Sequence, residues 1–330
     1  MKVPRIILYG GVALFALIGL VALMKKSKND KELATQTVSE QSPIVQEIAV
    51  EEEETSASVE DEKPISVAQE EIEKVEEVLP EANLIDKLFA TDSSKLDVVD
   101  TITYTSRVPW LKGRPAWIAD YASHHETTRH FIARSLNKKV DYFTQKVTPG
   151  DKFNVLKKNI SFYLLIDLSR SKMWFYSIDK DSNKRTLIKT YSIGLGRKDE
   201  TRPSGFLTPT GKYSLGSKVA IYKPGTMGYF QDRKIEMIRV FGTRWIPFDK
   251  EIEDCSESSQ GYGLHGTPWV PDSETNMLVE DKQRIGKYDS DGCIRLSSED
   301  IEELFAIVIS KPTIVELVKD FHDAKLPGEE

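Results

Sequence analysis

Two side chains that can perform covalent chemistry lie close together in the last quarter of the chain. Cys293 follows Gly292, and His265 precedes Gly266. A thiol becomes a good nucleophile only after it loses its proton, and a neighbouring imidazole can take that proton and later return it to a leaving amine. The adjoining glycines let a substrate backbone approach and let main-chain N–H groups face a developing oxyanion. The pair therefore predicts acyl transfer through a cysteine, with His265 as general acid and base.

The alternative is that both side chains are structural. A cysteine is more often a small buried apolar residue than a nucleophile, and a single histidine is more often structural than catalytic. The order of the residues favours catalysis: an aromatic-Gly-x-His-Gly-Thr phrase begins at Tyr262, and a Ser-x-Gly-Cys-Ile-Arg phrase begins at Ser290.

This pattern resembles the catalytic signature of the L,D-transpeptidases, the YkuD-type family of peptidoglycan enzymes. The matching residues are His265-Gly266-Thr267 and the run from Ser290 to Arg295. The phrases YSIGLGR and TPTGKYSL belong to the resemblance too, which covers about residues 162–318. There are two departures from the family pattern. Asp291 stands where members usually have a basic residue or histidine, and the spacer between His265 and Ser290 is longer, with a polar loop insertion predicted at residues 271–281.

The resemblance implies a reaction and its partners. Cys293 would attack the carbonyl of the diamino acid in a donor stem tetrapeptide, and the side-chain amine of an acceptor stem would resolve the thioester, giving a 3-3 cross-link. The Gly266 carbonyl would orient His265, and the backbone around Gly292 would form the oxyanion hole. The expected partners are peptidoglycan stem peptides and the membrane, with no nucleic acid. No cofactor and no metal are expected.

Several neighbouring residues are candidates for substrate binding, and each has a structural alternative. Arg295 could bind a substrate carboxylate, or it could pair with Asp289 or Asp291. The aromatic rings could wall the cleft or simply pack in the core. The full set of predicted substrate-binding residues is Arg295, Ser290, Thr267, Trp269 and Tyr262.

Other functions remain open on the same scaffold. Water in place of an amine would make the protein an L,D-carboxypeptidase, and a protein acceptor would make it a lipoprotein-to-peptidoglycan transferase. A non-catalytic wall-binding protein is the alternative outside enzymology. A disulfide from Cys255 to Cys293 would consume the nucleophile, but the polar run EDCSESSQ around Cys255 favours an exposed loop.

The beginning of the chain predicts a membrane anchor in residues 1–29. The run from Ile6 to Met24 has 19 uncharged residues, and at about 1.5 Å per residue it matches a bilayer core of about 30 Å. Lysines and arginines flank it about equally, so the positive-inside rule does not set its orientation. The family resemblance implies an extracytoplasmic catalytic domain, on the side where peptidoglycan lies.

Residues 30–100 form a predicted acidic linker. They hold 21 acidic residues against 5 lysines in a chain of net charge −7, and such composition favours an extended, largely disordered chain. Short helices are expected at 66–79 and 83–89. Residues 101–160 are predicted to be a small helical accessory unit with a short hairpin, in which the histidine spacing does not favour a metal site. Its expected core is Trp110, Trp117, Tyr121, Phe131, Ile132 and Leu136.

The catalytic domain is predicted at residues 161–320, with a tail at 321–330. Apolar runs predict strands at 162–168, 172–178, 185–193, 211–215, 237–241 and 313–318, with a hairpin turn around Arg170. One amphipathic helix is expected at 299–309, capped by Ser297 or Ser298. The fold class is therefore mostly β (α+β), a β-sandwich with a helix on one side.

Overall fold

The computed structural model describes residues 78–137 and 146–329, which lie in one unit of the chain that begins at Val75. The predicted anchor at 6–24 and the linker up to residue 77 fall outside the described residues. Within the described part of the chain, no helix is long and apolar enough to span a membrane.

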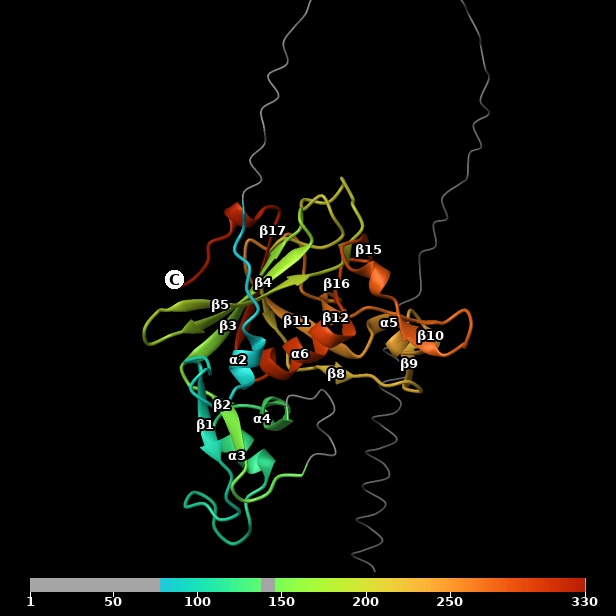
Figure 1. The fold of residues 1–330 in the computed structure, drawn as a ribbon. Helices are drawn as coiled ribbons and strands as arrows, with labels where there is room; N and C mark the ends of the chain where they lie inside the picture. Colours follow the sequence, from blue (N-terminus) through green and yellow to red (C-terminus); the bar gives the residue numbers. More distant parts are fainter. Residues whose placement is uncertain (1–77, 138–145, 330) are drawn as a thin grey trace, which may run out of the picture. The chain divides into compact units, whose positions relative to one another are not determined.

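A nine-stranded mixed sheet forms the centre of the fold (Figure 1). The strands follow the order β16-β12-β11-β7-β17-β3-β4-β5, and β8 pairs separately with β11. The pairs β12–β16 and β17–β3 are parallel, and the others are antiparallel. The strand bounds are β3 Ile160–Asp167, β4 Lys172–Asp179, β5 Arg185–Ser192, β7 Gly211–Leu215, β8 Ala220–Ile221, β11 Arg244–Glu253, β12 Gly263–Gly266, β16 Ile294–Leu296 and β17 Thr313–Val318. The predicted mostly β fold with few helices is confirmed.

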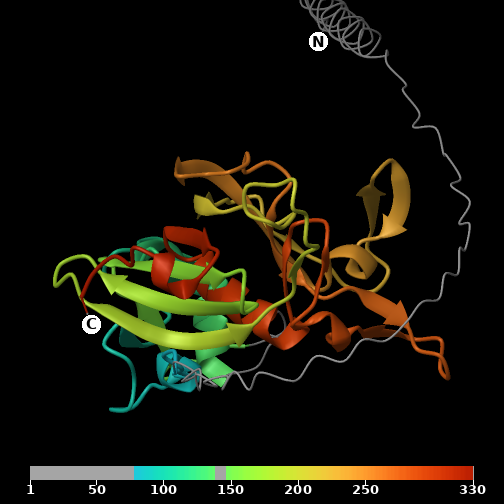
Figure 2. The ribbon, with the colours of Figure 1, turned by 90° about the horizontal axis from the view of Figure 1, so that it is seen from above.

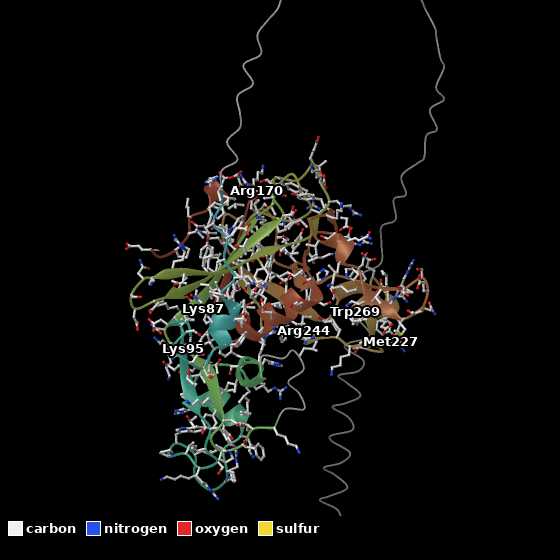
Figure 3. All side chains as sticks on the ribbon, viewed as in Figure 1. Lys87, Lys95, Arg170, Met227, Arg244 and Trp269 are labelled. Atoms are coloured by element: carbon white, nitrogen blue, oxygen red, sulfur yellow. The ribbon has the colours of Figure 1, made fainter. Side chains whose placement is uncertain are left out.

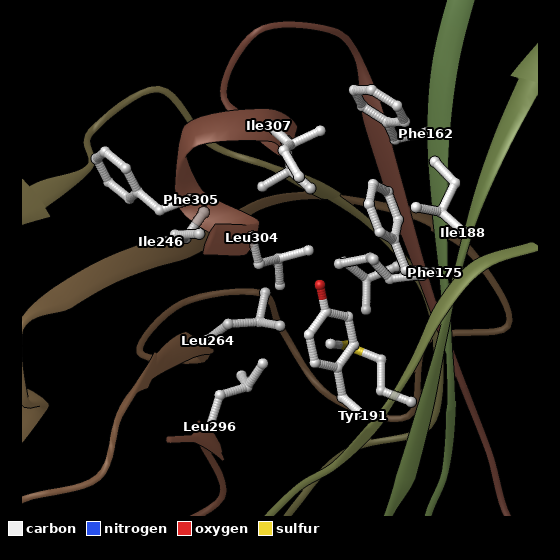
Figure 4. Packing of buried hydrophobic residues seen from close by; sticks show 14 of the residues in the cluster. Phe162, Phe175, Ile188, Tyr191, Ile246, Leu264, Leu296, Leu304, Phe305 and Ile307 are labelled. Atoms are coloured by element: carbon white, nitrogen blue, oxygen red, sulfur yellow. The ribbon is translucent and has the colours of Figure 1, made fainter. Parts of the chain in front are cut away.

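The central helix α6 spans Ser298–Val308 and packs against β11, β12 and β16. Its N-cap is Ser297, whose hydroxyl accepts the backbone N–H of Asp300 at 3.1 Å, so the predicted helix and cap are confirmed. The apolar face of α6 meets the side chains of β3, β4 and β5 in the main core (Figure 4). The labelled residues of this packing are Phe162, Phe175, Ile188, Tyr191, Ile246, Leu264, Leu296, Leu304, Phe305 and Ile307.

Strands β3 and β4 are buried on both faces, as their nearly unbroken apolar sequences require. One face belongs to the main core, and the other carries Trp174 and Tyr176 in a second cluster. Chain segments from both ends of the described region cover that second face. Trp174 donates its indole N–H to the Pro80 carbonyl at 2.7 Å and its ring lies 4.6 Å from that of Phe321.

The packed part of the chain extends beyond residues 100 and 320 at both ends. Helix α2, Ile85–Phe89, contributes three buried side chains to the main core, and the Leu84 N–H donates to the Ile188 carbonyl at 2.7 Å. At the other end, a short 3-10 helix, η2, spans Phe321–Asp323, and Arg185 bonds the carbonyls of residues 327 and 328. The segment around η2 covers the face of β3–β4 that carries Trp174 and Tyr176, and α2 packs into the main core, so both segments remove apolar side chains from water.

The accessory region combines two helices with two strands. Its elements are β1 Val99–Thr103, α3 Ile118–His124, α4 Arg129–Asn137 and β2 Lys152–Leu156. The strands pair antiparallel although about fifty residues separate them, so they are not a hairpin. Two predicted core residues are placed differently: Phe131 belongs to the main core, and Trp117 is 65% exposed. Trp117 lies at the N-terminal end of α3, where the Arg114 guanidinium stacks 4.8 Å from its ring.

Two hairpins project from the side of the sheet away from β3–β5 (Figures 1 and 2). One pairs β9 Met227–Phe230 with β10 Arg233–Glu236, and the other pairs β13 Trp269–Pro271 with β14 Leu278–Glu280. Figure 3 labels Met227 and Trp269 on this side. The predicted polar loop at 271–281 therefore contains a strand, β14. Val270 and Val279, which are partners in this hairpin, are β-branched residues that favour strands.

The predicted strand at 237–241 is wrong, since α5, Ile238–Phe241, is a single helical turn. Gly242 ends this turn with φ +60°, and a Cβ there would lie 2.6 Å from the Gly266 backbone. A glycine is required because backbone meets backbone, and a turn that folds this closely cannot continue as a strand. Three shorter elements complete the list: β6 Leu195–Gly196, the 3-10 helix η1 Lys282–Arg284, and β15 Tyr288–Ser290.

Candidate active site

The parallel pairing of β12 with β16 brings the chain segments of the predicted nucleophile and base side by side. Leu264 is the register partner of Ile294, and His265 is the partner of Arg295. Successive side chains of a strand point to opposite faces. Leu264 and Ile294 are fully buried in the main core, so His265, Arg295 and the preceding Cys293 belong to the other face. The core residues thus fix the register that aligns the reactive ones.

The imidazole of His265 is hydrogen-bonded to the carbonyl of the next residue and packs against two aromatic rings. Nδ1 lies 2.7 Å from the Gly266 carbonyl oxygen. Because a carbonyl only accepts, Nδ1 carries the proton, and Nε2 is the nitrogen able to take another. The Phe241 ring packs edge-on at 5.4 Å and the Trp245 ring lies at 6.0 Å.

Burial lowers the pKa of His265 to about 4, and the charge of Arg295 acts in the same direction. The Gly266 and Phe241 carbonyls favour the protonated ring but do not outweigh burial. At neutral pH the imidazole is therefore uncharged and ready to act as a base.

Cys293 ends a tight turn that begins at Ser290. The Ser290 hydroxyl, itself buried, donates to the Cys293 carbonyl at 2.7 Å and accepts the Gly292 N–H at 3.1 Å. Gly292 has φ +117°, and a Cβ at this position would lie 2.6 Å from a Tyr262 ring carbon and 2.7 Å from the Leu207 carbonyl oxygen. The turn therefore requires glycine, both for its backbone angle and for the space.

The Cys293 thiol is half-buried and free of any disulfide. Its Sγ donates to the Gly261 carbonyl at 3.5 Å. Burial raises the pKa of Cys293 to about 11, although the Gly263 backbone and Arg295 favour the thiolate. Burial dominates, so the thiol is protonated at neutral pH.

The segment that carries the YSIGLGR phrase supports the cysteine turn from behind. A Cβ on Gly196 would lie 2.9 Å from the Cα of Gly292, and the Gly196 N–H donates to the Thr208 hydroxyl at 2.8 Å. Gly194 bridges to Arg295 through two backbone bonds of 2.8 Å. The two phrases outside the His and Cys motifs thus build the wall on which the nucleophile sits.

Arg295 is bonded within the protein. It is mostly buried, with a side chain 13% exposed, and its Nη1 donates to Asp289 at 2.5 Å. Asp289 also accepts Arg284, which in turn bonds Asp281. Of the two predicted roles, this geometry matches the ion pair with Asp289. Asp291, the other predicted partner, instead pairs with Arg197 at 2.7 Å.

The two predicted substrate-binding residues after His265 are used to attach the β13–β14 hairpin. Thr267 is fully buried and donates to the Glu280 carboxylate at 2.7 Å. Glu280 also accepts the Ser298 N–H at 2.5 Å, and the Trp269 indole donates to the Ser298 hydroxyl at 3.2 Å. These contacts join the hairpin to the first residue of α6, so Thr267 and Trp269 have structural contacts. Tyr262, in contrast, lies against the cysteine turn.

The second cysteine is also free. Cys255 is half-buried and its thiol donates to the Lys212 carbonyl at 3.0 Å. The considered bridge from Cys255 to Cys293 is therefore not formed. In the described ranges 78–137 and 146–329, no group of three His, Cys, Asp or Glu side chains is placed to hold a metal ion.

Several residues of the site were not identified from the sequence. Phe241 and Trp245 enclose the imidazole from α5 and β11, and neither belongs to the His or Cys phrase. Arg197 lies in a phrase already noted for its glycines, yet nothing in that phrase indicates which acid it meets. Only the three-dimensional packing of these segments identifies them.

In a mostly β domain, the turn that ends at the half-buried Cys293 thus leads into a strand paired in parallel with the strand that carries the buried His265. Residues 161–317 match the family model described as the YkuD L,D-transpeptidase catalytic domain. This segment is therefore similar to the catalytic domains of a family of cell-wall enzymes.

Individual relatives share only part of the chain. YqjB of Bacillus subtilis (strain 168), a relative described as an L,D-transpeptidase, is 29% identical over 121 residues, which are 36% of this chain and 53% of the relative. The chain thus spans about half the length of that curated relative.

Solved structures with similarity include the helical cell shape determining protein Pgp2 of Campylobacter jejuni, at 19% identity and TM-score 0.32, covering 52% of this chain and 51% of that one. Bd1075 of Bdellovibrio bacteriovorus gives 16% identity and TM-score 0.31, with 48% of each chain covered. L,D-transpeptidase 1 of Mycobacterium tuberculosis gives 15% identity and TM-score 0.24, covering 51% and 68%.

Proposed function

We propose that this protein is a peptidoglycan L,D-transpeptidase that forms 3-3 cross-links through a thioester on Cys293. The observation that supports the proposal is the parallel pairing of the strand that carries His265 with the strand that begins directly after Cys293, with Nδ1 of the imidazole bonded to the Gly266 carbonyl at 2.7 Å. The proposed catalytic domain lies on the extracytoplasmic side, where stem peptides are found.

Acylation begins with a neutral thiol and a neutral imidazole. Nε2 of His265 takes the thiol proton as Sγ attacks the carbonyl carbon of the diamino acid in the donor. The S–C bond forms, and the oxyanion collapses as the C–N bond breaks. The electron pair goes to the leaving amine nitrogen, which receives the proton from the imidazolium.

The second half of the reaction reverses these roles. The side-chain amine of an acceptor stem attacks the thioester carbonyl and loses a proton to His265. The new C–N bond forms, the C–S bond breaks, and the sulfur regains the proton. Water in place of the amine would complete carboxypeptidase chemistry on the same residues.

The oxyanion donor proposed on this geometry is the N–H of Cys293. The N–H of Gly292 was expected to share this role, but it donates to the Ser290 hydroxyl at 3.1 Å. Gly292 contributes through its backbone shape instead. Loss of one oxyanion donor typically slows an acyl transfer by about 10²–10³.

Intact-mass spectrometry tests the proposal directly. The protein is incubated with purified disaccharide-tetrapeptide, with and without an acceptor stem that carries a free diamino-acid amine. We expect an adduct on Cys293 that corresponds to loss of the terminal residue, and its conversion to a cross-linked product when acceptor is added. Hydrolysis alone in the presence of acceptor would indicate a carboxypeptidase. Absence of any adduct, with the protein folded, would overturn the proposal.

A further inference from the structure

An exposed ion pair stands at the edge of the cysteine turn and has no role in the chemistry above. Nη2 of Arg197 donates to Oδ1 of Asp291 at 2.7 Å, and the two side chains are 60% and 71% exposed. Asp291 is two residues before Cys293. The pair therefore places one positive and one negative charge at the solvent side of the nucleophile.

The backbone of Arg197 is fixed while its guanidinium reaches into solvent. Its N–H donates to the Ser290 carbonyl at 3.0 Å, and its own carbonyl accepts the Leu207 N–H at 2.8 Å. The preceding Gly196 packs on Gly292, as described above. The guanidinium thus extends from a backbone position that hydrogen bonds hold in place, as recognition of an anionic group at a fixed position requires.

The other nearby arginines are occupied differently. Arg295 is buried and bonded to Asp289. Arg202, on the loop after Arg197, contacts two carboxylates, those of Glu257 and Asp199. Arg197 is bonded to one carboxylate that is itself highly exposed, and exposed ion pairs contribute little to stability. A carboxylate from a ligand can therefore replace Asp291 at little cost, and a guanidinium can bind it through two parallel bonds.

We infer that Arg197 is a specificity residue that binds the C-terminal carboxylate of the donor peptide, and that Asp291 holds its place until the donor arrives. This inference rests on the proposed function. The carboxylate of the terminal residue lies one residue beyond the carbonyl that Cys293 attacks, and a chain advances by about 3.5 Å per residue. Asp291 is two residues from Cys293 in the chain, so its carboxylate lies near the place where the terminal carboxylate of the donor would be. The pair thus selects donors that end at the leaving residue.

The electrostatic part is tested without any peptide. Cys293 is alkylated with iodoacetate, an anion, or iodoacetamide, which is neutral, and peptide mass mapping reports the rate at each cysteine. The quantity compared is the rate with iodoacetate divided by the rate with iodoacetamide. Both reagents require the thiolate, so any change in the pKa of the thiol cancels in this ratio. We expect Arg197→Gln to lower the ratio at Cys293 several-fold and Asp291→Asn to raise it. The ratio at Cys255 is the internal control and should not change.

An unchanged ratio at Cys293 in both variants would show that neither charge is felt at the nucleophile and would overturn the inference. The accessory pair Arg114–Asp120, bonded at 2.6 and 2.7 Å, provides a matched control. Arg114→Gln removes an arginine from an ion pair of the same kind but from a different part of the fold, and it should leave the ratio at the wild-type value.

The recognition part uses two modified donors, one with a C-terminal amide and one with an amide on the diamino-acid carboxyl. We expect wild-type kcat/KM to fall about 10–100-fold for the C-terminal amide only, as for loss of a charge-assisted hydrogen bond. The Arg197→Gln variant should be acylated at equal rates by the donor with a C-terminal carboxylate and the donor with a C-terminal amide. The Arg202→Gln variant should still prefer the C-terminal carboxylate. If kcat/KM fell only for the donor with the amide on the diamino-acid carboxyl, Arg197 would bind that carboxylate. The inference that it binds the C-terminal carboxylate would then be wrong.

The two proposals fail in distinguishable ways. If wild-type protein is acylated equally by the carboxylate and amide donors, the inference is wrong and the transpeptidase proposal stands. If no donor acylates the wild type, the proposed function is wrong, and the recognition part fails with it.

Discussion

His265 lies directly opposite Arg295 in the parallel pairing of β12 and β16. The guanidinium therefore stands beside both members of the reactive pair: it disfavours the imidazolium and favours the thiolate. Its charge is shared with Asp289, which is also bonded to Arg284. Burial nevertheless dominates at both residues, so the resting pair is a neutral thiol and a neutral imidazole.

The resting state can be read from the pH dependence of thiolate absorbance near 240 nm. The pKa of Cys293 is raised to about 11 and that of His265 is lowered to about 4. The thiol is thus protonated below pH 11, and the imidazole is neutral above pH 4. We expect the difference between wild type and Cys293→Ala to show no thiolate from pH 5 to pH 8. A thiolate signal in this range would instead indicate a thiolate–imidazolium pair.

The same directions predict the pH–rate profile of acylation. The base must be neutral to accept the thiol proton, so kcat/KM should decline only as pH falls toward about 4, well below the usual histidine value of about 6.5. Measurement of kcat/KM from pH 4 to pH 8 checks this. An acid limb centred near 6.5 would mean that water reaches the imidazole in the free enzyme.

Removal of the nucleophile should abolish turnover without loss of the fold. Cys293→Ala deletes one half-buried sulfur at the end of a turn held by Ser290, so the melting temperature should change by no more than a few degrees. Acyl-enzyme formation, followed by intact mass, should vanish. Cys255→Ala is the matched control, since it removes the other free thiol and should keep full activity. Turnover by the Cys293→Ala variant would remove the proposed mechanism.

Removal of the base should slow acylation by about 10²–10⁴, the usual contribution of general base catalysis. His265→Ala leaves a space between the Phe241 and Trp245 rings, so added imidazole should restore part of the rate. His125→Gln, in the accessory region, serves as control. A variant that retains the wild-type rate constant for acylation would show that another group takes the thiol proton.

The glycine of the cysteine turn can be tested against a second glycine with a similar backbone. Gly292→Ala introduces a Cβ only 2.6 Å from Tyr262 and 2.7 Å from a carbonyl oxygen, at φ +117°. Gly205 has φ +79° with nothing within 4 Å of its Cβ position. Gly205→Ala should therefore cost about 1 kcal/mol for the backbone angle alone. Gly292→Ala should add about 1–3 kcal/mol for overpacking and lose most activity. Equal unfolding free energies would show that the turn can relax.

The strands β3, β4 and β17 and the cap of α6 could be predicted because they follow from local patterns of residue type. His265 and Cys293 could be proposed as the reactive pair because each lies in a short phrase of recognisable residue types. The fate of Arg295 and Asp291 could not be predicted in this way, because the choice between acids depends on how β6 and η1 pack against the turn. The short helix expected at 83–89 is present as α2, but its packing into the core could not be predicted, because the acidic composition around it does not show where its few apolar residues are buried.

A buried amide tests whether the segment around α2 is an integral part of the fold. Asn154 on β2 is fully buried; its Nδ2 donates to the carbonyls of Leu88 and Ala90 at 3.0 and 2.7 Å, and its Oδ1 accepts the Thr101 hydroxyl at 2.8 Å. Asn154→Ala leaves two carbonyls and a hydroxyl without these partners and should lower the free energy of unfolding by about 2–4 kcal/mol. Thr101→Val removes one of the three bonds and should cost only about 0.5–1.5 kcal/mol. Urea unfolding followed by tryptophan fluorescence measures both. If Asn154→Ala were as stable as wild type, α2 would not depend on β2 for its place.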